Sequence, residues 1–296
     1  MTESPVAHEP VLVASLLRLM EFRPGQAVLD GTVGLGGHAM AILPRIAPGG
    51  RYIGIDADLA MIEEARRRLA SHGGAVELVV GNYAELGEVL ERVGLEQVDH
   101  MLLDLGVNSA QLADAARGFS FERDGPLDMR YDRSGGERAL DLVNRLSEAE
   151  LADLIYEFGG EGASRKVAKR ICQVRHEGRI TTTKVLARAV ESAMGGGDRL
   201  HPATRVFQAL RIAVNHELDN LRTFVDRAPE RLRSGGKLAV ISFHSLEDGL
   251  VKRFIRRAVA DGRMSELTRR PEVADQHERA RNPRARSAKL RVAQRV

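Results

Sequence analysis

The sequence predicts an α/β protein whose mostly parallel sheet carries an inserted all-α domain. Strand and helix patterns alternate over residues 27–105, and the strands are continuous apolar runs. Such runs are typical of parallel strands that are covered on both faces. From about residue 108 to 200 only helical patterns remain, and a strand pattern returns at 237–243. We therefore expect one discontinuous domain of residues 1–110 and 203–296, and a helical domain of residues 111–202.

The expected elements follow in order along the chain. A helix over 11–20 precedes strands over 27–30, 52–56, 76–80 and 98–105, separated by helices over 38–46, 59–69 and 83–93. After a polar loop over 118–136, helices are expected over 147–158, 164–177 and 182–194, the last closed by Gly195-Gly196-Gly197. One long helix over 203–222, a strand over 237–243, a helix over 246–259 and a strand over 290–293 complete the chain. The charged segment 261–286 has weak periodicity, so we expect little regular structure there.

Composition excludes several classes of protein. With 43% hydrophobic residues in a chain of 296, a sizeable core is available, which argues against global disorder. The single cysteine, Cys172, excludes an internal disulfide and a cysteine-rich zinc site. No apolar run is long enough to span a membrane, and the first residues do not have the pattern of a signal peptide. We expect a cytoplasmic protein that does not bind membranes.

The net charge of +3 conceals a gradient. Residues 1–110 sum to −7, residues 111–220 to zero and residues 221–296 to +10. This gradient has two interpretations, a solvated basic tail or a surface that binds nucleic acid.

The first two strand ends indicate a nucleotide-like cofactor, since ligands of open parallel sheets bind beyond the carboxyl ends of the strands. Gly34-Leu35-Gly36-Gly37-His38-Ala39 fits the loose pattern G-x-G-x-x-A. Asp56 ends the second strand, at the place where a carboxylate would accept both ribose hydroxyls. Loop and acid together favour an adenosine-containing cofactor, but they do not distinguish NAD from S-adenosylmethionine.

The third and fourth strand ends favour methyl transfer. Asn82-Tyr83 ends the third strand, where a side chain could flank an adenine ring. Asp104 ends the fourth, where a carboxylate could hold the amino-acid part of the cofactor or accept a hydrogen bond from an amine substrate. The structural alternative for Asp104 is a helix cap.

Specific segments resemble one bacterial family. They are His8 to Leu12, Gly31 to His38, Leu102 to Val107, Arg117 to Phe121, Asp124 to Arg130, His201 to Arg205, Phe207 to Ile212, Ile241 to Asp248 and Asn282 to Ser287. In the residues of these segments and in their order along the chain, the protein resembles the bacterial small-subunit ribosomal RNA methyltransferase H (MraW) family.

The resemblance implies a class I, Rossmann-like methyltransferase with an inserted substrate-recognition domain. It implies S-adenosylmethionine as donor and the N4 amino group of one cytidine in the decoding region of 16S rRNA as acceptor. The partner would be 16S rRNA within the small ribosomal subunit, and a homodimer is compatible with it. The cofactor-binding residues implied are Gly36, Gly37, His38, Asp56, Tyr83, Asp104 and Gln111, and no metal is expected.

Catalysis and RNA binding require further residues. Asp104 is our candidate for orienting the amine, and we expect its replacement to abolish methylation. Residues 161–188 carry a net charge of +6, which favours RNA contact over an ordinary basic helix surface. The candidate substrate-binding residues are Arg165, Lys166, Lys169, Arg170, His201, Arg205 and His244, although a lone histidine such as His244 is more often structural.

Two other functions stay open at this point. An NAD-dependent oxidoreductase would share the glycine loop and Asp56. A non-catalytic ribosome-assembly factor would keep the fold, although the acidic residues present at the strand ends argue against a catalytically inactive site.

Overall fold

A computed structural model describes residues 10–194 and 201–296. The chain divides into two compact units, here called the sheet unit (residues 1–106 with 218–296) and the helical unit (residues 107–217). His8, Glu9 and Gly195-Gly196-Gly197, which carried sequence predictions, lie outside the described residues. No helix in the described parts of the chain combines the length and apolarity needed to cross a bilayer.

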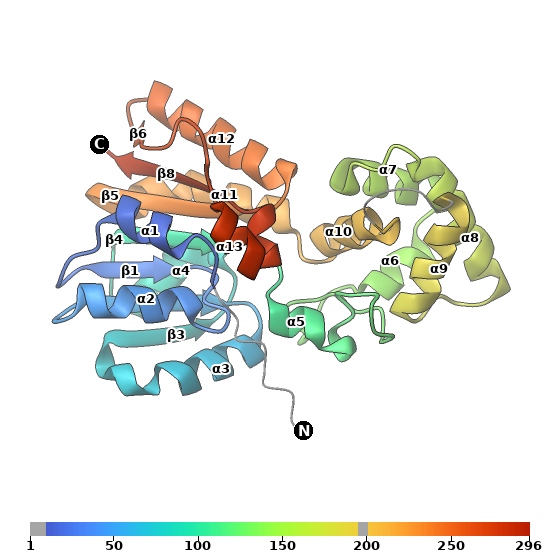
Figure 1. Cartoon of the computed structure of the whole chain (residues 1–296), viewed down its shortest axis with the longest axis horizontal. Coiled ribbons are helices and arrows are strands. Elements are labelled where there is room, and N and C mark those ends of the chain that lie inside the picture. Colours follow the sequence, from blue (N-terminus) through green and yellow to red (C-terminus); the bar gives the residue numbers. More distant parts are fainter. Residues whose placement is uncertain (1–9, 195–200) are drawn as a thin grey trace. The chain divides into compact units, whose positions relative to one another are not determined.

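The sheet unit is built on one eight-stranded sheet (Figure 1). Its strands are β1 (Ala27–Asp30), β2 (Arg51–Asp56), β3 (Val76–Val80), β4 (Val98–Asp104), β5 (Leu232–Ser242), β6 (Met264–Glu266), β7 (Glu272–Val273) and β8 (Lys289–Arg295). The order is β3-β2-β1-β4-β5-β8-β6, with β7 also paired to β8. The first five strands of this order are parallel, whereas β6, β7 and β8 pair antiparallel. This order confirms the predicted α/β fold with a mostly parallel sheet.

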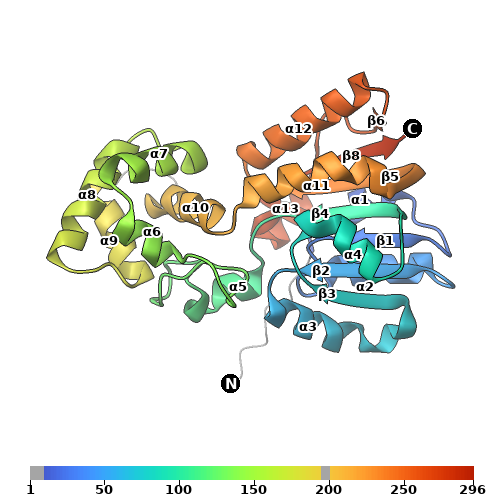
Figure 2. The ribbon, with the colours of Figure 1, turned by 180° about the vertical axis from the view of Figure 1, so that it is seen from behind.

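Helices cover both faces of the sheet, as the apolar strands predicted (Figure 1 and Figure 2). The bounds are α1 (Val13–Met20), α2 (Gly37–Ile46), α3 (Leu59–Leu69), α4 (Leu86–Arg92), α11 (Glu217–Arg231), α12 (Ser245–Ala260) and α13 (Gln276–Arg281). Short 3-10 turns lie at Ala70–Ala75, Tyr83–Glu85 and Pro283–Arg286. Successive residues of β1 serve opposite faces: Val28 packs in the core under α1, α2 and α3, and Leu29 in the core under α4, α11 and α12. Parallel pairing between two apolar faces therefore places the carboxyl ends of β1, β2, β3 and β4 along one edge.

The expectation for residues 261–286 was wrong, because this segment folds into β6, β7, α13 and a 3-10 turn. Its backbone pairs with β8, for example Glu272 with Leu290. The hydroxyl of Thr268 accepts a hydrogen bond from the Val292 amide (2.9 Å), and small side chains such as Ala285 are fully buried. Pairing with a distant strand supplies the order that the local hydrophobic pattern does not indicate.

The helical unit has its own hydrophobic core. Its elements are α5 (Ser109–Ala113), a 3-10 turn at Ala115–Arg117, α6 (Ala139–Arg145), α7 (Glu148–Gly159), α8 (Ser164–Glu177), α9 (Thr183–Met194) and α10 (Ala203–Val214). The start of α7 has the predicted capping box: the Ser147 hydroxyl accepts from the Glu150 amide (3.3 Å), and the Glu150 carboxylate accepts from the Ser147 amide (2.8 Å).

The single helix expected over 203–222 is in fact two helices, and this also corrects the predicted domain boundary. The chain breaks at His216, whose φ is +50°. Asn215 stabilises the break, since its side chain donates to the Met129 carbonyl (2.7 Å) and accepts from the Tyr131 amide (2.8 Å). The apolar face of α10 packs in the core of the helical unit through residues such as Phe207. Residues 203–217 therefore belong to the helical unit, which ends at residue 217 rather than at 202.

Candidate functional site

The loop after β1 is braced by a buried acid. Asp30 is 1% exposed, and its carboxylate accepts from the Tyr52 hydroxyl (2.5 Å) and the Thr32 amide (2.9 Å). Burial raises the pKa of Asp30, and the hydrogen bond from Tyr52 opposes this rise. Because its side chain is almost fully buried, Asp30 shapes the loop rather than offering a ligand to the cofactor.

Glycine is required at two points of this loop. A Cβ on Gly31 would lie 2.5 Å from Leu103 Cδ2 and 2.9 Å from Tyr83 Cβ, so the first turn can pass only without a side chain. Gly36 has φ of +78° directly before α2, a conformation that L-residues seldom adopt. The chain therefore turns within a few residues from the end of β1 into the first turn of α2, where Gly37 and His38 lie.

Asp56, at the end of β2, ties this loop to the neighbouring strand. One carboxylate oxygen accepts from the Gly34 amide and the other from the Asp58 amide, both at 2.9 Å. Each carboxylate oxygen has two lone pairs, so each keeps one for a ligand, which suits two adjacent hydroxyls. Burial raises the pKa of Asp56 to about 7, although the hydrogen bonds from these two backbone amides partly lower it.

His38 and Asp104 meet beside the loop. His38 Nε2 lies 3.0 Å from the Val11 carbonyl, and because a carbonyl only accepts, this nitrogen carries the proton. Nδ1 lies 3.7 Å from Asp104 Oδ2. The Asp104 amide donates to the Thr32 hydroxyl (2.6 Å), which anchors the end of β4 to the loop after β1.

The carboxylate of Asp104 is the unusual group of this edge. Its side chain is 12% exposed, and among the described residues its buried Oδ1 has no hydrogen-bond partner. Burial raises the pKa of Asp104, and the nearby His38 and Arg284 partly oppose the rise. A buried acceptor without a donor is costly, so this atom fits a ligand that brings an N–H group.

Six of the seven predicted cofactor residues lie at the ends of β1 to β4 in the sheet unit: Gly36, Gly37, His38, Asp56, Tyr83 and Asp104. The ring of Tyr83 packs edge-on against Phe224, with centroids 5.7 Å apart. Gln111 instead lies in the helical unit, where its side chain accepts from the Asn108 amide (3.1 Å) in the capping box of α5. Its contact with the cofactor stays a prediction.

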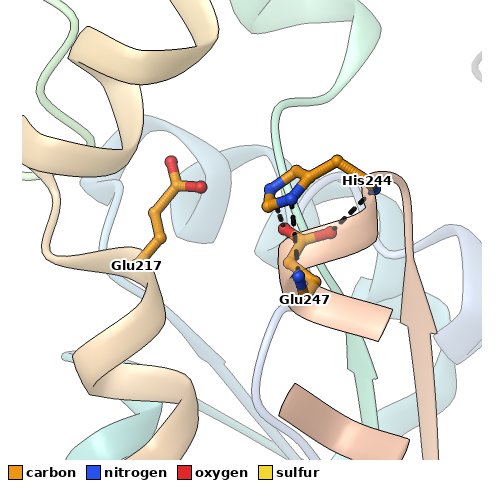
Figure 3. A group of neighbouring side chains, drawn as sticks. All are labelled: Glu217, His244 and Glu247. Atoms are coloured by element: carbon orange, nitrogen blue, oxygen red, sulfur yellow. Dashed lines mark hydrogen bonds and ion pairs between the residues drawn. The ribbon is translucent and has the colours of Figure 1, made fainter. Parts of the chain in front are cut away.

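His244 follows β5 and begins α12, where it has a structural partner (Figure 3). Its Nδ1 accepts from the Glu247 amide (3.4 Å), and its Nε2 lies 3.0 Å from Glu247 Oε1. Glu247 is 2% exposed, and its Oε2 accepts from the Phe243 amide (2.8 Å). Sequence reasoning missed Glu247, although an acid three residues after a helix cap is the pattern of a capping box.

Arg284 was also missed as an individual site residue. It lies in the 3-10 turn Pro283–Arg286, whose geometry is fixed by the Asn282 side chain accepting from the Arg284 amide (3.1 Å). Its guanidinium carbon lies 5.2 Å from the centre of the Phe243 ring. Arg284 also contributes positive charge near Asp104. The segment Asn282 to Ser287 had indicated this region without indicating which residue acts.

The predicted RNA-binding residues lie in the helical unit, His244 excepted. Arg165, Lys166 and Lys169 are exposed on α8. Arg170, on the same helix, donates to the Ser192 hydroxyl (2.9 Å).

His201 and Arg205 have partners within the helical unit. His201 Nε2 lies 2.6 Å from Glu191 Oε1, and its ring stacks on Phe121 at 4.3 Å between centroids. Arg205 lies 3.3 Å from Glu161 Oε2. These contacts give both residues a structural role, and their contact with RNA stays a prediction.

Comparison with known proteins identifies the family. Residues 5–296 match the MraW methylase family. Three proteins named ribosomal RNA small subunit methyltransferase H are similar over nearly their whole length. The one from Syntrophotalea carbinolica is 47% identical, with 100% of both chains covered. The one from Sorangium cellulosum is 49% identical, covering 98% of this chain and 91% of its own. The one from Geobacter sulfurreducens is 46% identical, covering 98% and 99%. The chain therefore belongs to the MraW methylase family and is an S-adenosylmethionine-dependent methyltransferase.

Proposed function

We propose that this protein methylates the N4 amino group of a cytidine in the decoding region of 16S rRNA. The observation that carries the proposal is the buried Asp104 Oδ1, which lacks a donor among the described residues and lies beside the cofactor loop. The names of the relatives support an rRNA substrate in the small subunit.

The residues of the sheet edge fit the cofactor. Asp56 keeps one acceptor position on each oxygen for the ribose hydroxyls, while its bonds to the Gly34 and Asp58 amides hold the carboxylate in place. The turn at Gly36 and Gly37 packs closely against Leu69 and Pro10, and a backbone without side chains can approach the amino-acid group of the cofactor. When bound, S-adenosylmethionine supplies an electrophilic methyl group on a sulfonium.

The chemical difficulty lies in the acceptor, because the lone pair of an exocyclic cytosine amine is delocalised into the ring. The amine nitrogen must bond to the methyl carbon as the carbon–sulfur bond breaks, and it must lose one proton. Asp104 Oδ1 can accept an N–H of this amine and so orient the nitrogen. Because burial raises the pKa of Asp104, its carboxylate is a stronger proton acceptor than an exposed aspartate. Positioning of this kind supplies at most roughly 7–11 kcal/mol of the barrier.

The target base must also leave its stack, at a cost of a few kcal/mol. Contacts to the RNA backbone hold the duplex or loop while the base is extruded. We assign this role to the exposed basic side chains of α8: Arg165, Lys166 and Lys169.

The test is transfer of tritium from methyl-labelled S-adenosylmethionine to isolated small subunits and to naked 16S rRNA, followed by nucleoside analysis. We expect label in N4-methylcytidine with the wild-type protein. Asp104→Asn should lower the rate by about 10²–10⁴-fold, with an unchanged circular dichroism spectrum. Asp219→Asn is the matched control, since Asp219 is 73% exposed and pairs only with Arg222 among the described residues.

Label in another nucleoside would refute the assigned acceptor. Wild-type turnover by Asp104→Asn would remove Asp104 from the site. No label with a folded wild-type protein would favour the non-catalytic assembly factor. Membership of a methylase family already argues against an NAD-dependent oxidoreductase, and an unchanged NADH absorbance would complete that exclusion. The cytoplasmic location and the homodimer stay predictions, which cell fractionation and sedimentation test.

A further inference from the structure

The helical unit contains a surface pocket whose lining is mainly basic. It is lined by Asp141, Asn144, Arg145, Arg175, His176 and Arg179, from α6, α8 and the turn that follows α8. We propose that this basic pocket binds one backbone phosphate of the RNA substrate. The proposal rests on the proposed function, because it takes RNA as the molecule that supplies the phosphate.

Asn144 fixes two of the segments that line the pocket before any ligand arrives. Asn144 Nδ2 donates to the carbonyls of Leu140 (2.6 Å) and Ile180 (2.8 Å), and Asn144 Oδ1 accepts from the Ile180 amide (3.0 Å). These bonds hold α6 against the chain that follows α8. Arg145 on α6 and Arg179 in the turn after α8 are therefore held at a fixed distance from each other.

Arg175 is held at the wall of the pocket with donors to spare. Its Nη1 donates to the Val143 carbonyl (2.7 Å), which uses one of the five N–H groups of a guanidinium. Within the described parts of the chain, no carboxylate forms an ion pair with Arg175. A guanidinium that is fixed at one nitrogen and open at the others suits the oxygens of a phosphate.

Asp141, the one carboxylate of the lining, is paired mainly with Arg138, which lies outside the lining. Asp141 accepts from Arg138 Nε (2.8 Å) and Nη2 (3.0 Å), and the side-chain hydrogen bond from Arg138 lowers its pKa. Arg179 reaches the same carboxylate only at 3.5 Å and is 63% exposed. The positive charges of Arg175 and Arg179 therefore remain available to an anion.

Arg145 has a partner that is easily displaced. Its Nε and Nη2 bond to Glu137 at 2.8 and 3.0 Å, but the two side chains are 60% and 40% exposed. Exposed ion pairs contribute only about 0–1 kcal/mol. Arg145 can thus turn part of its guanidinium to a phosphate at small cost.

One further feature bears on the ligand, and a second offers a competing explanation. The lining has three arginines and one imidazole, His176, but no Phe, Tyr or Trp, so cationic donors dominate it and a sequence-independent phosphate contact fits best. Arg145 and Arg175 also lie in the last turns of α6 and α8, where cations are favoured by the helix dipole. Capping of these helix ends is the competing explanation, and it predicts no effect on RNA binding.

The experiment measures binding of a labelled decoding-region RNA fragment between 50 and 200 mM salt. Arg179→Gln should weaken binding by about tenfold and lower the slope of log K against log salt by about one. Arg145→Gln tests a second wall of the same pocket and should act in the same direction. Arg133→Gln is the matched control, because Arg133 is an exposed arginine of the same unit that lies outside both the lining and the basic segment 161–188.

Slopes equal to wild type for both pocket variants, or equal to that of Arg133→Gln, would overturn the proposal. A site for free phosphate would also overturn it: inorganic phosphate would then bind wild type but not Arg179→Gln, while RNA affinity stayed equal. These outcomes differ from failure of the proposed function, in which the wild-type protein would bind RNA without methylating it.

Discussion

We predict that the carboxyl group of Asp56 makes cofactor binding depend on pH near neutrality. Burial raises the pKa of Asp56 to about 7, and both of its oxygens already accept backbone amides, from Gly34 and Asp58. Above this pKa each oxygen still offers an acceptor to one ribose hydroxyl. Below it, protonation turns one oxygen into a donor and removes an acceptor. Affinity for the ribose should therefore rise as pH increases through 7.

The size of the effect follows from the ionised fraction. With a pKa of about 7, roughly 9% of Asp56 is ionised at pH 6 and roughly 91% at pH 8. If only the ionised form binds, the dissociation constant falls about tenfold from pH 6 to pH 8, or about 1.4 kcal/mol. Above pH 8 the affinity should level off.

Calorimetric titration with methylthioadenosine measures this effect cleanly. That ligand keeps the adenine and both ribose hydroxyls but lacks the amino group of S-adenosylmethionine, which would itself titrate near pH 7.7–8.0, as α-amino groups do. Asp56→Asn should bind weakly at every pH, because an amide does not ionise in this range. A flat wild-type profile, or the same pH dependence in Asp56→Asn, would refute the reasoning.

Three further predictions concern the loop, the helical unit and Asp104. Gly31→Ala should destabilise the protein by about 1–3 kcal/mol, because its Cβ would lie 2.5 Å from Leu103 Cδ2; an unchanged urea midpoint would contradict this. Ser147→Ala removes the acceptor for the Glu150 amide and should cost about 1 kcal/mol, measured by thermal unfolding, with methylation at 25 °C unaffected. Arg284→Gln removes a charge that lowers the pKa of Asp104, so the acid limb of the pH–rate profile should move to higher pH; an acid limb that stays in place or moves to lower pH would contradict this.

The sheet edge could be predicted from the sequence because its signals are local. Continuous apolar runs marked β1 to β4, and the residues that end these strands, such as Asp56 and Asp104, are the groups that the sheet order brings to one edge. The capping box at Ser147 was equally local.

The remaining features depend on contacts between residues far apart in the chain. The helix break at residue 216 depends on Asn215 bonding to Met129, 86 residues away, while the apolar pattern runs on through the break. The order of residues 261–286 depends on pairing with β8. The basic pocket joins Arg145 with Arg175 and Arg179, which only the packing of α6 beside α8 brings together. Glu247, the partner of His244, is the opposite case. An acid three residues after a helix cap is a local sequence pattern, so this residue could have been predicted.

Mass spectrometry of small-subunit rRNA from cells with and without this protein tests the central claim most directly. We predict N4-methylcytidine at one decoding-region cytidine when the protein is present, its loss when the protein is absent, and its return with the wild-type protein but not with Asp104→Asn. An N4-methylcytidine signal that is unchanged by removal of the protein would contradict the account.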